Sequence, residues 1–197
     1  MSVEHIIPES LGNTEHVLPR GVVCDVCNNY FARKIEGPVL ETAYFRHKRS
    51  MMWVANKRGR VPAMSAVLPS LRMKADVWLN GPSLHIEPRD RDRQGELEQS
   101  LLERKGGRLF IPIPADPDQK LMSRLLGKIA IEALAQHLMK VEGWRAELLR
   151  VEGLRKLSRF VRVGDRPEKW EYSRRSIYSP DQLFGVGKDR YEILHEF

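Results

Sequence analysis

The chain has 197 residues, with 33 Lys or Arg against 26 Asp or Glu and a formal net charge of +7. With 30% charged and 42% hydrophobic residues, it is typical of a folded protein rather than a disordered one. The most apolar stretch, residues 121–141, contains Arg124, Lys128, Glu132 and Lys140, which excludes a membrane span. Acidic residues near the N-terminus argue against a signal peptide, and two cysteines are too few for a disulfide framework, so we expect a cytoplasmic protein.

Residues 1–50 are dense in turn and motif signals, and we predict that they form a module of their own, followed by an α+β accessory region over residues 51–197. Turns are expected at Gly12 and over residues 19–21. Residues 22–24 are expected to form a strand that runs into a helix. The Gly37-Pro38 pair predicts the end of that helix and the start of another.

A basic stretch, residues 46–60, contains no acidic residue and has Trp53 within it. Clustered cations beside an aromatic ring favour contacts to nucleic-acid phosphates with one stacked base. The alternative is an ordinary solvated surface with Trp53 in the core, and the sequence leaves both open. The cations are Arg46, Lys48, Arg49, Lys57, Arg58 and Arg60.

The accessory region is predicted to begin with strands and to continue with helices. Strands are expected over residues 63–68, 73–79, 84–87 and 108–113, with Asn80-Gly81 as a hairpin turn and a short helix over 95–105. A long amphipathic helix is predicted over 119–141, then helices over 144–151 and 154–163 and strands over 171–178 and 190–197. The apolar stripe expected to place the long helix in the core consists of Met122, Leu126, Ile129, Ala133, Leu134, Leu138 and Val141.

The N-terminal module holds the residue types that could carry chemistry. Cys24 and Cys27, three apart at a helix start, would present two thiolates to one side, which is half of a tetrahedral zinc site. Glu4 and Asn28 could offer oxygen ligands to a hard cation, and His5 offers an imidazole on the other face of the strand. A carboxylate and an amide holding Mg²⁺ beside an imidazole that activates water can hydrolyse a phosphodiester.

Two runs of this module, EHIIPESLGN at residues 4–13 and GVVCDVCNNYF at 21–31, resemble the HNH endonucleases, in the variant whose last motif residue is asparagine. The resemblance covers about residues 3–36. It implies a ββα-metal fold in which a hairpin and a helix clasp one divalent ion. The predicted fold class is therefore α+β, with an N-terminal ββα-metal module.

The resemblance also implies roles for individual residues. His5 would be the general base that activates the attacking water. Glu4 and Asn28 would ligate the catalytic Mg²⁺ or Mn²⁺. Asn13, or alternatively His16, would support the loop and orient the base.

Cys24 and Cys27 would be the second pair of a structural zinc site made of four cysteines. The first pair, which zinc-bearing members carry upstream of the acid-His pair, is missing here. Three interpretations compete: the start at Met1 was placed too far downstream, His16 or another chain completes the zinc site, or the metal has been lost. We favour the first, because the motif over residues 3–13 is intact. A redox dithiol is less favoured, since no βαβ pattern surrounds the pair.

The sequence thus predicts a metal-dependent endonuclease that acts on DNA, or on RNA, with little sequence selectivity. Arg33, Lys34 and the basic stretch would contact phosphates, which position a nucleic acid without specifying its sequence. The alternative is a degenerate or truncated HNH module that binds nucleic acid without cleaving it. A zinc-ribbon adaptor for protein is a third class, which the acid-free stretch over 46–60 disfavours.

Overall fold

Two short strands and a helix open the chain. The computed structural model describes residues 3–56, 58–80, 83–103, 108–164 and 170–173. β1 (Glu4–His5) pairs antiparallel with β2 (Val17–Leu18). The strand predicted over residues 22–24 does not form, because the chain turns after β2 and the Val22 amide donates to the Pro19 carbonyl. Gly21 takes a left-handed φ of 87° in this turn, a conformation that interrupts an extended strand.

The first helix is longer than the sequence predicts, because Gly37-Pro38 does not end it. α1 (Asp25–Phe31) continues through a π-helical turn (Ala32–Glu36) into α2 (Gly37–Leu40). A proline lacks the N–H of a regular helix and crowds the carbonyl four residues before it. The wider π turn directly ahead of Pro38 accommodates both effects. α3 (Ala43–Met51) follows, with Thr42 as its N-cap, whose hydroxyl accepts from the Phe45 amide.

The middle of the chain forms an antiparallel sheet in the order β3 (Met64–Leu68), β4 (Met73–Asn80), β5 (Ser83–Pro88). Asn80 pairs with Ser83, which confirms the hairpin, while the predicted Gly81 of its turn lies outside the described residues. Among the described residues, the strand predicted over 108–113 is represented by one bridge, Val67 to Phe110. Pro112 and Pro114 cannot donate to a ladder, so this segment stays irregular. α4 (Gln94–Leu102) packs Leu97 against the buried face.

Three helices complete the described chain: α5 (Gln119–Leu138), α6 (Trp144–Arg150) and α7 (Glu152–Val163). Short 3₁₀ turns lie at Glu9–Leu11, Pro69–Leu71 and Arg91–Arg93. Gly127 of α5 allows α7 to approach, because a Cβ there would lie 2.8 Å from Cγ2 of Val161. The two strands predicted in the tail lie outside the described residues, except for residues 171–173, which form no strand. None of the described helices has the length and apolar character needed to cross a membrane.

The buried face of α5 is not the stripe that the sequence predicts. Leu125, Lys128, Glu132 and Ala135 are among its buried residues, whereas the predicted stripe is half-buried or exposed. Met122 and Ile129 of that stripe do pack at the margin of the core. The face is shifted because α5 turns two charged residues inward.

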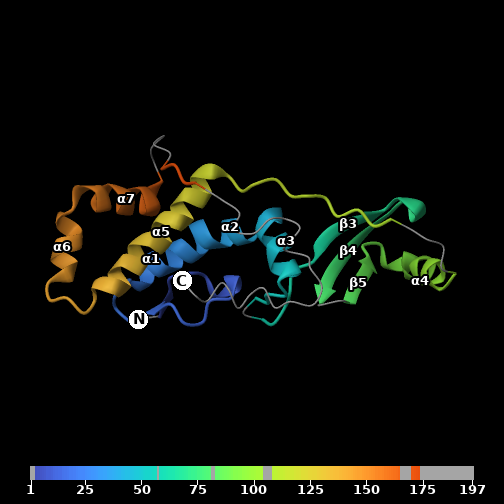
Figure 1. Ribbon diagram of the computed structural model, residues 1–197, viewed down its shortest axis with the longest axis horizontal. Helices are drawn as coiled ribbons and strands as arrows, with labels where there is room; N and C mark the ends of the chain where they lie inside the picture. Colours follow the sequence, from blue (N-terminus) through green and yellow to red (C-terminus); the bar gives the residue numbers. More distant parts are fainter. Residues whose placement is uncertain (1–2, 57, 81–82, 104–107, 165–169, 174–197) are drawn as a thin grey trace.

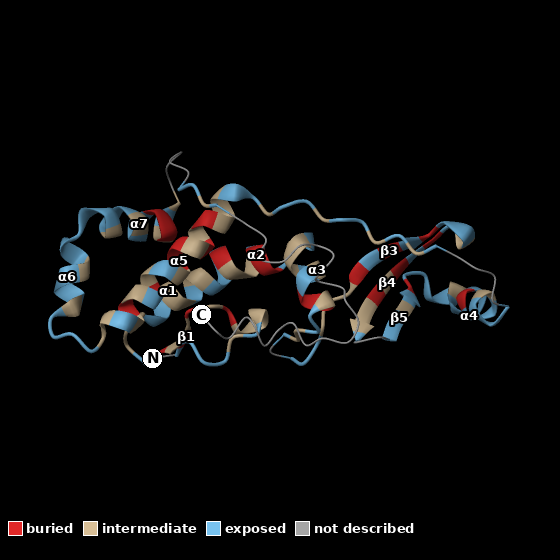
Figure 2. Ribbon diagram, viewed as in Figure 1, coloured by how far each residue is buried: buried red, intermediate tan, exposed pale blue. Residues whose placement is uncertain are grey.

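The elements form two separate cores in an elongated molecule. Figure 1 shows α1, α2, α5, α6 and α7 at one end, β3, β4, β5 and α4 at the other, and α3 between them. We call these parts the helical end (residues 3–40 and 119–163) and the sheet end (residues 64–102). Figure 2 shows buried residues gathered in both places. Ile35, Val39, Leu125, Phe160 and Val161 form the helical core, and residues of β3, β4 and α4 form the other. The predicted α+β class is confirmed.

Candidate active site

One hydrogen bond joins the two halves of the N-terminal motif. The side-chain amide of Asn28, on α1, donates from Nδ2 to the Val3 carbonyl at 3.3 Å. Val3 directly precedes Glu4 and His5 on β1. The structure therefore brings the acid-His pair and the Cys-x-x-Cys-Asn segment side by side, although about two dozen residues separate them in the sequence.

The His5 side chain is half-buried and has an acidic neighbour. Its Nε2 lies 4.0 Å from Oε2 of Glu9, an ion pair only when the ring is protonated. Its Nδ1 is buried and has no hydrogen-bond partner among the described residues. The Glu9 carboxylate can stabilise the protonated form of the ring, as the acidic partner of a general base does.

Asn13 closes the loop between β1 and β2 with its side chain. Nδ2 donates to the Ile7 and His16 carbonyls at 2.9 and 3.1 Å. Oδ1 accepts from the Glu15 and His16 amides at 3.2 and 2.9 Å. Both ends of the loop are thus tied to one side chain, the local arrangement that asparagine favours in turns. His16 takes part through its backbone, and its side chain is exposed.

The Glu4 carboxylate lies inside the protein, against a lysine from α5. It is 5% exposed, and its Oε1 is 2.5 Å from Nζ of Lys128. Burial raises the pKa of Glu4 above its usual value, while the hydrogen bond and charge of Lys128 oppose that rise. Glu4, which is expected to hold a metal, therefore has the Lys128 ammonium as its cationic partner among the described residues.

Lys128 is the centre of a buried cluster with three carboxylates. Its side chain is fully buried, and Nζ lies 2.7 Å from Oε1 of Glu36 and 3.0 Å from Oε2 of Glu132, in addition to Glu4. Burial alone would lower the pKa of Lys128, but the surrounding carboxylates raise it. Burial and the negative charges of Glu4 and Glu36 raise the pKa of Glu132 to about 8, against the opposing effect of Lys128. The cluster has more carboxylates than cations, and Oε1 of Glu132 has no hydrogen-bond partner in the described part of the chain.

Sequence reasoning missed Glu36, Lys128 and Glu132. In the sequence, Lys128 and Glu132 stand out only as charges that exclude a membrane span. Their i, i+4 spacing within the most apolar helix was the available signal, because two opposite charges on such a helix can pair on its inward face. Nothing in the sequence links them to Glu4, which is more than 120 residues away along the chain.

The two cysteines lie at the start of α1, with Cys24 exposed and Cys27 half-buried. Cys24 is the N-cap, and its Sγ accepts from the Cys27 amide at 3.4 Å. That hydrogen bond lowers the pKa of the Cys24 thiol, whereas burial raises that of Cys27 despite the nearby Arg162. The 197 residues contain no other cysteine, so they could supply at most two of the four thiolates of a Cys₄ zinc site.

The donor chemistry near β1 suits a hard divalent cation. No group of three or more His, Cys, Asp or Glu residues in the described ranges is arranged as a metal site. The Glu4 carboxylate and the Asn28 amide are nevertheless oxygen ligands of the kind Mg²⁺ and Mn²⁺ take, and Asn28 is held to the residue before Glu4. The surplus of buried carboxylates around Lys128 is a further feature that a cation would offset.

The basic residues predicted to contact phosphates are not all exposed. Arg33, Lys34, Arg46, Lys48, Arg58 and Arg60 are exposed, and Lys57 lies outside the described residues. Arg49 instead points inward from α3, is 6% exposed, and has its pKa lowered by burial. Trp53 is 45% exposed and belongs to neither core. It adopts a positive φ of 53°, an uncommon conformation for a bulky residue.

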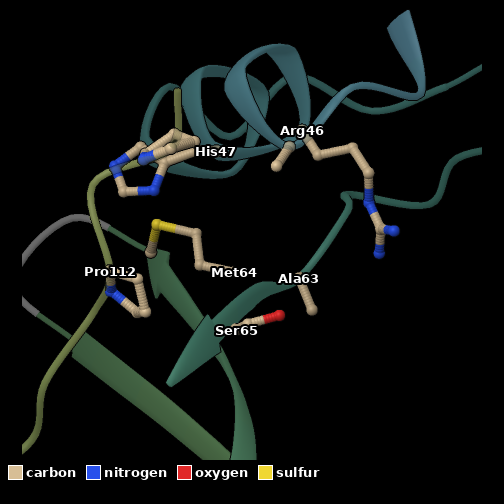
Figure 3. A pocket seen from close by; sticks show the side chains of 8 residues that line it. Arg46, His47, Ala63, Met64, Ser65 and Pro112 are labelled. Atoms are coloured by element: carbon tan, nitrogen blue, oxygen red, sulfur yellow. The ribbon is translucent and has the colours of Figure 1, made fainter. Parts of the chain in front are cut away.

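A small cavity of about 140 Å³ lies where α3 meets β3. Figure 3 shows the His47 ring facing Met64 and Pro112, with the Arg46 guanidinium extending away from them. Burial, and then the charge of Lys48, lower the pKa of His47. None of the motif residues lines this cavity, which belongs to the junction between the two ends of the molecule.

The hairpin of β1 and β2 and the helix α1 that follows it form a ββα arrangement. In a comparison with protein families, the model described as HNH endonuclease matches residues 1–42. The matched segment contains β1, β2, α1 and α2, and with them every residue of the predicted motif. Neither the curated proteins nor the solved structures yielded a match.

Proposed function

We propose that the chain is a metal-dependent endonuclease that hydrolyses phosphodiester bonds of DNA, with its active centre at β1 and the start of α1. The match of residues 1–42 to the HNH endonuclease family carries the proposal. The hydrogen bond from Asn28 to Val3 supports it, because it brings the two motif halves together. RNA is the other substrate that the same chemistry admits.

In this proposal His5 is the general base. It accepts a proton from the attacking water, and the Glu9 carboxylate 4.0 Å from Nε2 then stabilises the charged ring. Glu4 and Asn28 hold the Mg²⁺ or Mn²⁺. A bound divalent ion stabilises charge on the scissile phosphate and on the leaving oxygen. Asn13 keeps the loop after β1 closed, so that His5 and Glu9 remain facing each other.

Cys24 and Cys27 would hold a structural zinc together with ligands from outside these 197 residues. Thiolates at the first turn of α1 would fix the start of the helix, since zinc ligation adds folding free energy in small modules. The exposed side chain of Cys24 is compatible with a ligand set completed by another segment or chain.

A second candidate function is nucleic-acid binding without cleavage. The observation that favours it is the ion pair of Glu4 with Lys128, which gives the proposed metal ligand a protein cation as its partner. In that case the exposed basic residues would bind phosphates and the motif would be a structural remnant.

Nicking of supercoiled plasmid tests the proposal. We expect cleavage by the purified chain with Mg²⁺ or Mn²⁺ and none with EDTA. His5→Ala should reduce the rate by about 10²- to 10⁴-fold, the usual contribution of a general base, with DNA affinity nearly unchanged. His85→Ala is the matched control, because His85 is an exposed histidine paired with Glu87 at the sheet end. DNA binding without metal-dependent nicking by the folded wild type would instead support the second candidate.

A further inference from the structure

The strand that carries the proposed catalytic pair is too short to be fixed by its own sheet. β1 has two residues and pairs only with the two residues of β2. Isolated two-stranded hairpins are marginal in water even when they are longer. The position of Glu4 and His5 therefore depends on contacts from elsewhere in the fold.

Besides the Asn28 amide, which holds Val3, and the Gln136 amide, which holds Val17, one side chain of α5 contacts the motif directly. Nζ of Lys128 donates to the His5 carbonyl at 2.9 Å and lies 3.4 Å from the Ile6 carbonyl. It also lies 2.5 Å from the Glu4 carboxylate. One ammonium thus contacts three consecutive residues of the motif, through two backbone groups and one side chain. It constrains both the path of β1 and the direction of the Glu4 carboxylate.

The ammonium is itself held in place. Glu132 lies one turn along α5, and Glu36 belongs to the π-helical turn that follows α1. The same cation therefore bridges β1, the continuation of α1 and α5. A lysine with this burial must keep its partners, because a buried ammonium without them carries a large desolvation penalty. A planar guanidinium could preserve the charge but could not point one nitrogen at all of these oxygens.

We propose that Lys128 is a positioning residue of the nuclease centre, which sets the Glu4 carboxylate and the His5 backbone in the geometry that cleavage needs. The inference rests on the proposed function. It extends the functional unit from the segment matched by the family model to α5, 123 residues further along the chain than His5.

The test uses the full chain with Lys128→Met, Lys128→Arg and the control Lys120→Met, which removes a lysine from the first turn of the same helix. Plasmid nicking gives kcat at saturating Mn²⁺, and electron paramagnetic resonance gives the affinity for Mn²⁺ alone. We expect Lys128→Met to bind Mn²⁺ at least as tightly as the wild type, because the carboxylates lose their resident cation. Its kcat should fall by about 100-fold, the typical effect of a misplacement of about 1 Å.

Lys128→Arg separates positioning from charge. It should restore the unfolding midpoint in urea towards that of the wild type, because the buried charge is kept, while kcat stays low. If Lys128→Arg restored kcat as fully as stability, the role of Lys128 would be charge compensation only, and the inference would fail.

A readout independent of cleavage is amide hydrogen exchange at Ile6, whose N–H donates to the His16 carbonyl at 3.0 Å. We expect Lys128→Met to accelerate exchange at Ile6 by about 10-fold or more, with protection at Ala75 of β4 unchanged. Unchanged protection at Ile6 together with unchanged kcat would overturn the inference. If exchange also accelerates at Ala75, Lys128→Met has loosened the whole fold. The same measurements, exchange at Ile6 and kcat, are then made on the double variant Lys128→Met/Glu132→Gln, which removes one buried negative charge along with the cation. The inference is overturned if both are unchanged in the double variant.

The wild type distinguishes failure of the proposed function from failure of this inference. Absence of metal-dependent nicking by the folded wild type defeats the proposed function and, with it, this inference. Nicking by the wild type that is retained in Lys128→Met defeats the inference alone.

Discussion

The two ends of the molecule are held together by different means. At the sheet end, alternate residues of β3 and β4 point inward, and none of the buried residues described in β3, β4 and β5 is charged. At the helical end, Glu4, Lys128 and Glu132 are buried among the apolar side chains. A buried ion cluster adds little net stability compared with apolar packing of the same volume. The difference is consistent with a role for these charges other than stability, and it is this end that contains the segment matched by the HNH endonuclease family model.

Truncation of one buried side chain in each core should produce the largest difference in nicking activity between the two ends. Ile35 is fully buried in the helical core and Met73 is 1% exposed in the sheet core. We expect Ile35→Ala and Met73→Ala each to lower the free energy of unfolding by about 2–5 kcal/mol, through reduced burial and the cavity left behind. Only Ile35→Ala should also reduce nicking under conditions where both variants are folded, because the π turn that carries Ile35 also carries Glu36.

Urea unfolding followed by circular dichroism measures the first effect, and plasmid nicking at low urea measures the second. Equal loss of nicking in two folded variants would show that the sheet end is as closely coupled to the site as the helical end is.

The buried charges should make stability depend on pH at the helical end. The pKa of Glu132 is raised to about 8 in the fold, so the folded chain binds this proton more tightly than the unfolded chain does. Raising the pH from about 5 to about 8 therefore favours unfolding through this group. Glu132→Gln removes the titration, and we expect it to be more stable than the wild type by about 1–3 kcal/mol above pH 8, with little difference near pH 5.

The other charged groups that face Glu132 are Glu4 of β1, Glu36 of the π turn and Lys128 of α5. All three are present in both proteins, so their own titration largely cancels in the comparison. Thermal unfolding of both proteins between pH 5 and 9 provides the measurement. Parallel stability curves would mean that Glu132 keeps an ordinary titration in the folded chain.

The sequence predicts the sheet end better than the helical end, and the physical reason lies in how each core is encoded. Alternation of apolar residues and the Asn80-Gly81 signal determine β3, β4 and their hairpin with few alternatives. The helix that contains Pro38 continues where the local rule predicts a break, because a π turn absorbs the missing N–H. Such a compensation depends on the surrounding packing and has no signature of its own in the sequence.

The candidate site shows the same limit. The motif residues all lie within residues 4–28, and the resemblance implies that the two halves of the motif meet, so their proximity around β1 and α1 could be anticipated. Lys128 approaches β1 only because α5 packs across α2 and the π turn, a tertiary arrangement that no local pattern specifies. The periodicity of α5 was misleading for the same reason: hydrophobic spacing does not reveal that a lysine and a glutamate replace apolar residues on the inward face.

Removal of a loop-closing asparagine, either at the helical end or in the connection from α3 to β3, should have a smaller effect, and the two removals should differ. Asn13→Ala removes hydrogen bonds to both sides of the loop after β1, and we expect a decrease of about 1–3 kcal/mol in unfolding free energy with reduced nicking. Asn56→Ala is the matched control, because Oδ1 of Asn56 similarly accepts from the Arg58 and Arg60 amides. It should destabilise the chain by a similar or smaller amount without changing kcat. A lower kcat in both variants would locate the effect in general loop stability rather than in the site.

The smallest expected effect concerns the surface between the two ends. Arg58 and Arg60 are exposed in the connection from α3 to β3, whereas Arg91 is exposed next to α4 at the sheet end. If nucleic acid lies across the junction and the helical end, Arg58→Gln/Arg60→Gln should weaken DNA binding uniformly across sequences. The slope of log K against log salt should then fall by about 1 for each phosphate that is no longer neutralised. Arg91→Gln removes the same kind of charge but should leave the slope unchanged. Fluorescence anisotropy at several salt concentrations measures this slope. An equal decrease in the slope for Arg91→Gln would mean that the net charge of the protein attracts the DNA. An unchanged slope for the double variant would place the DNA elsewhere on the molecule.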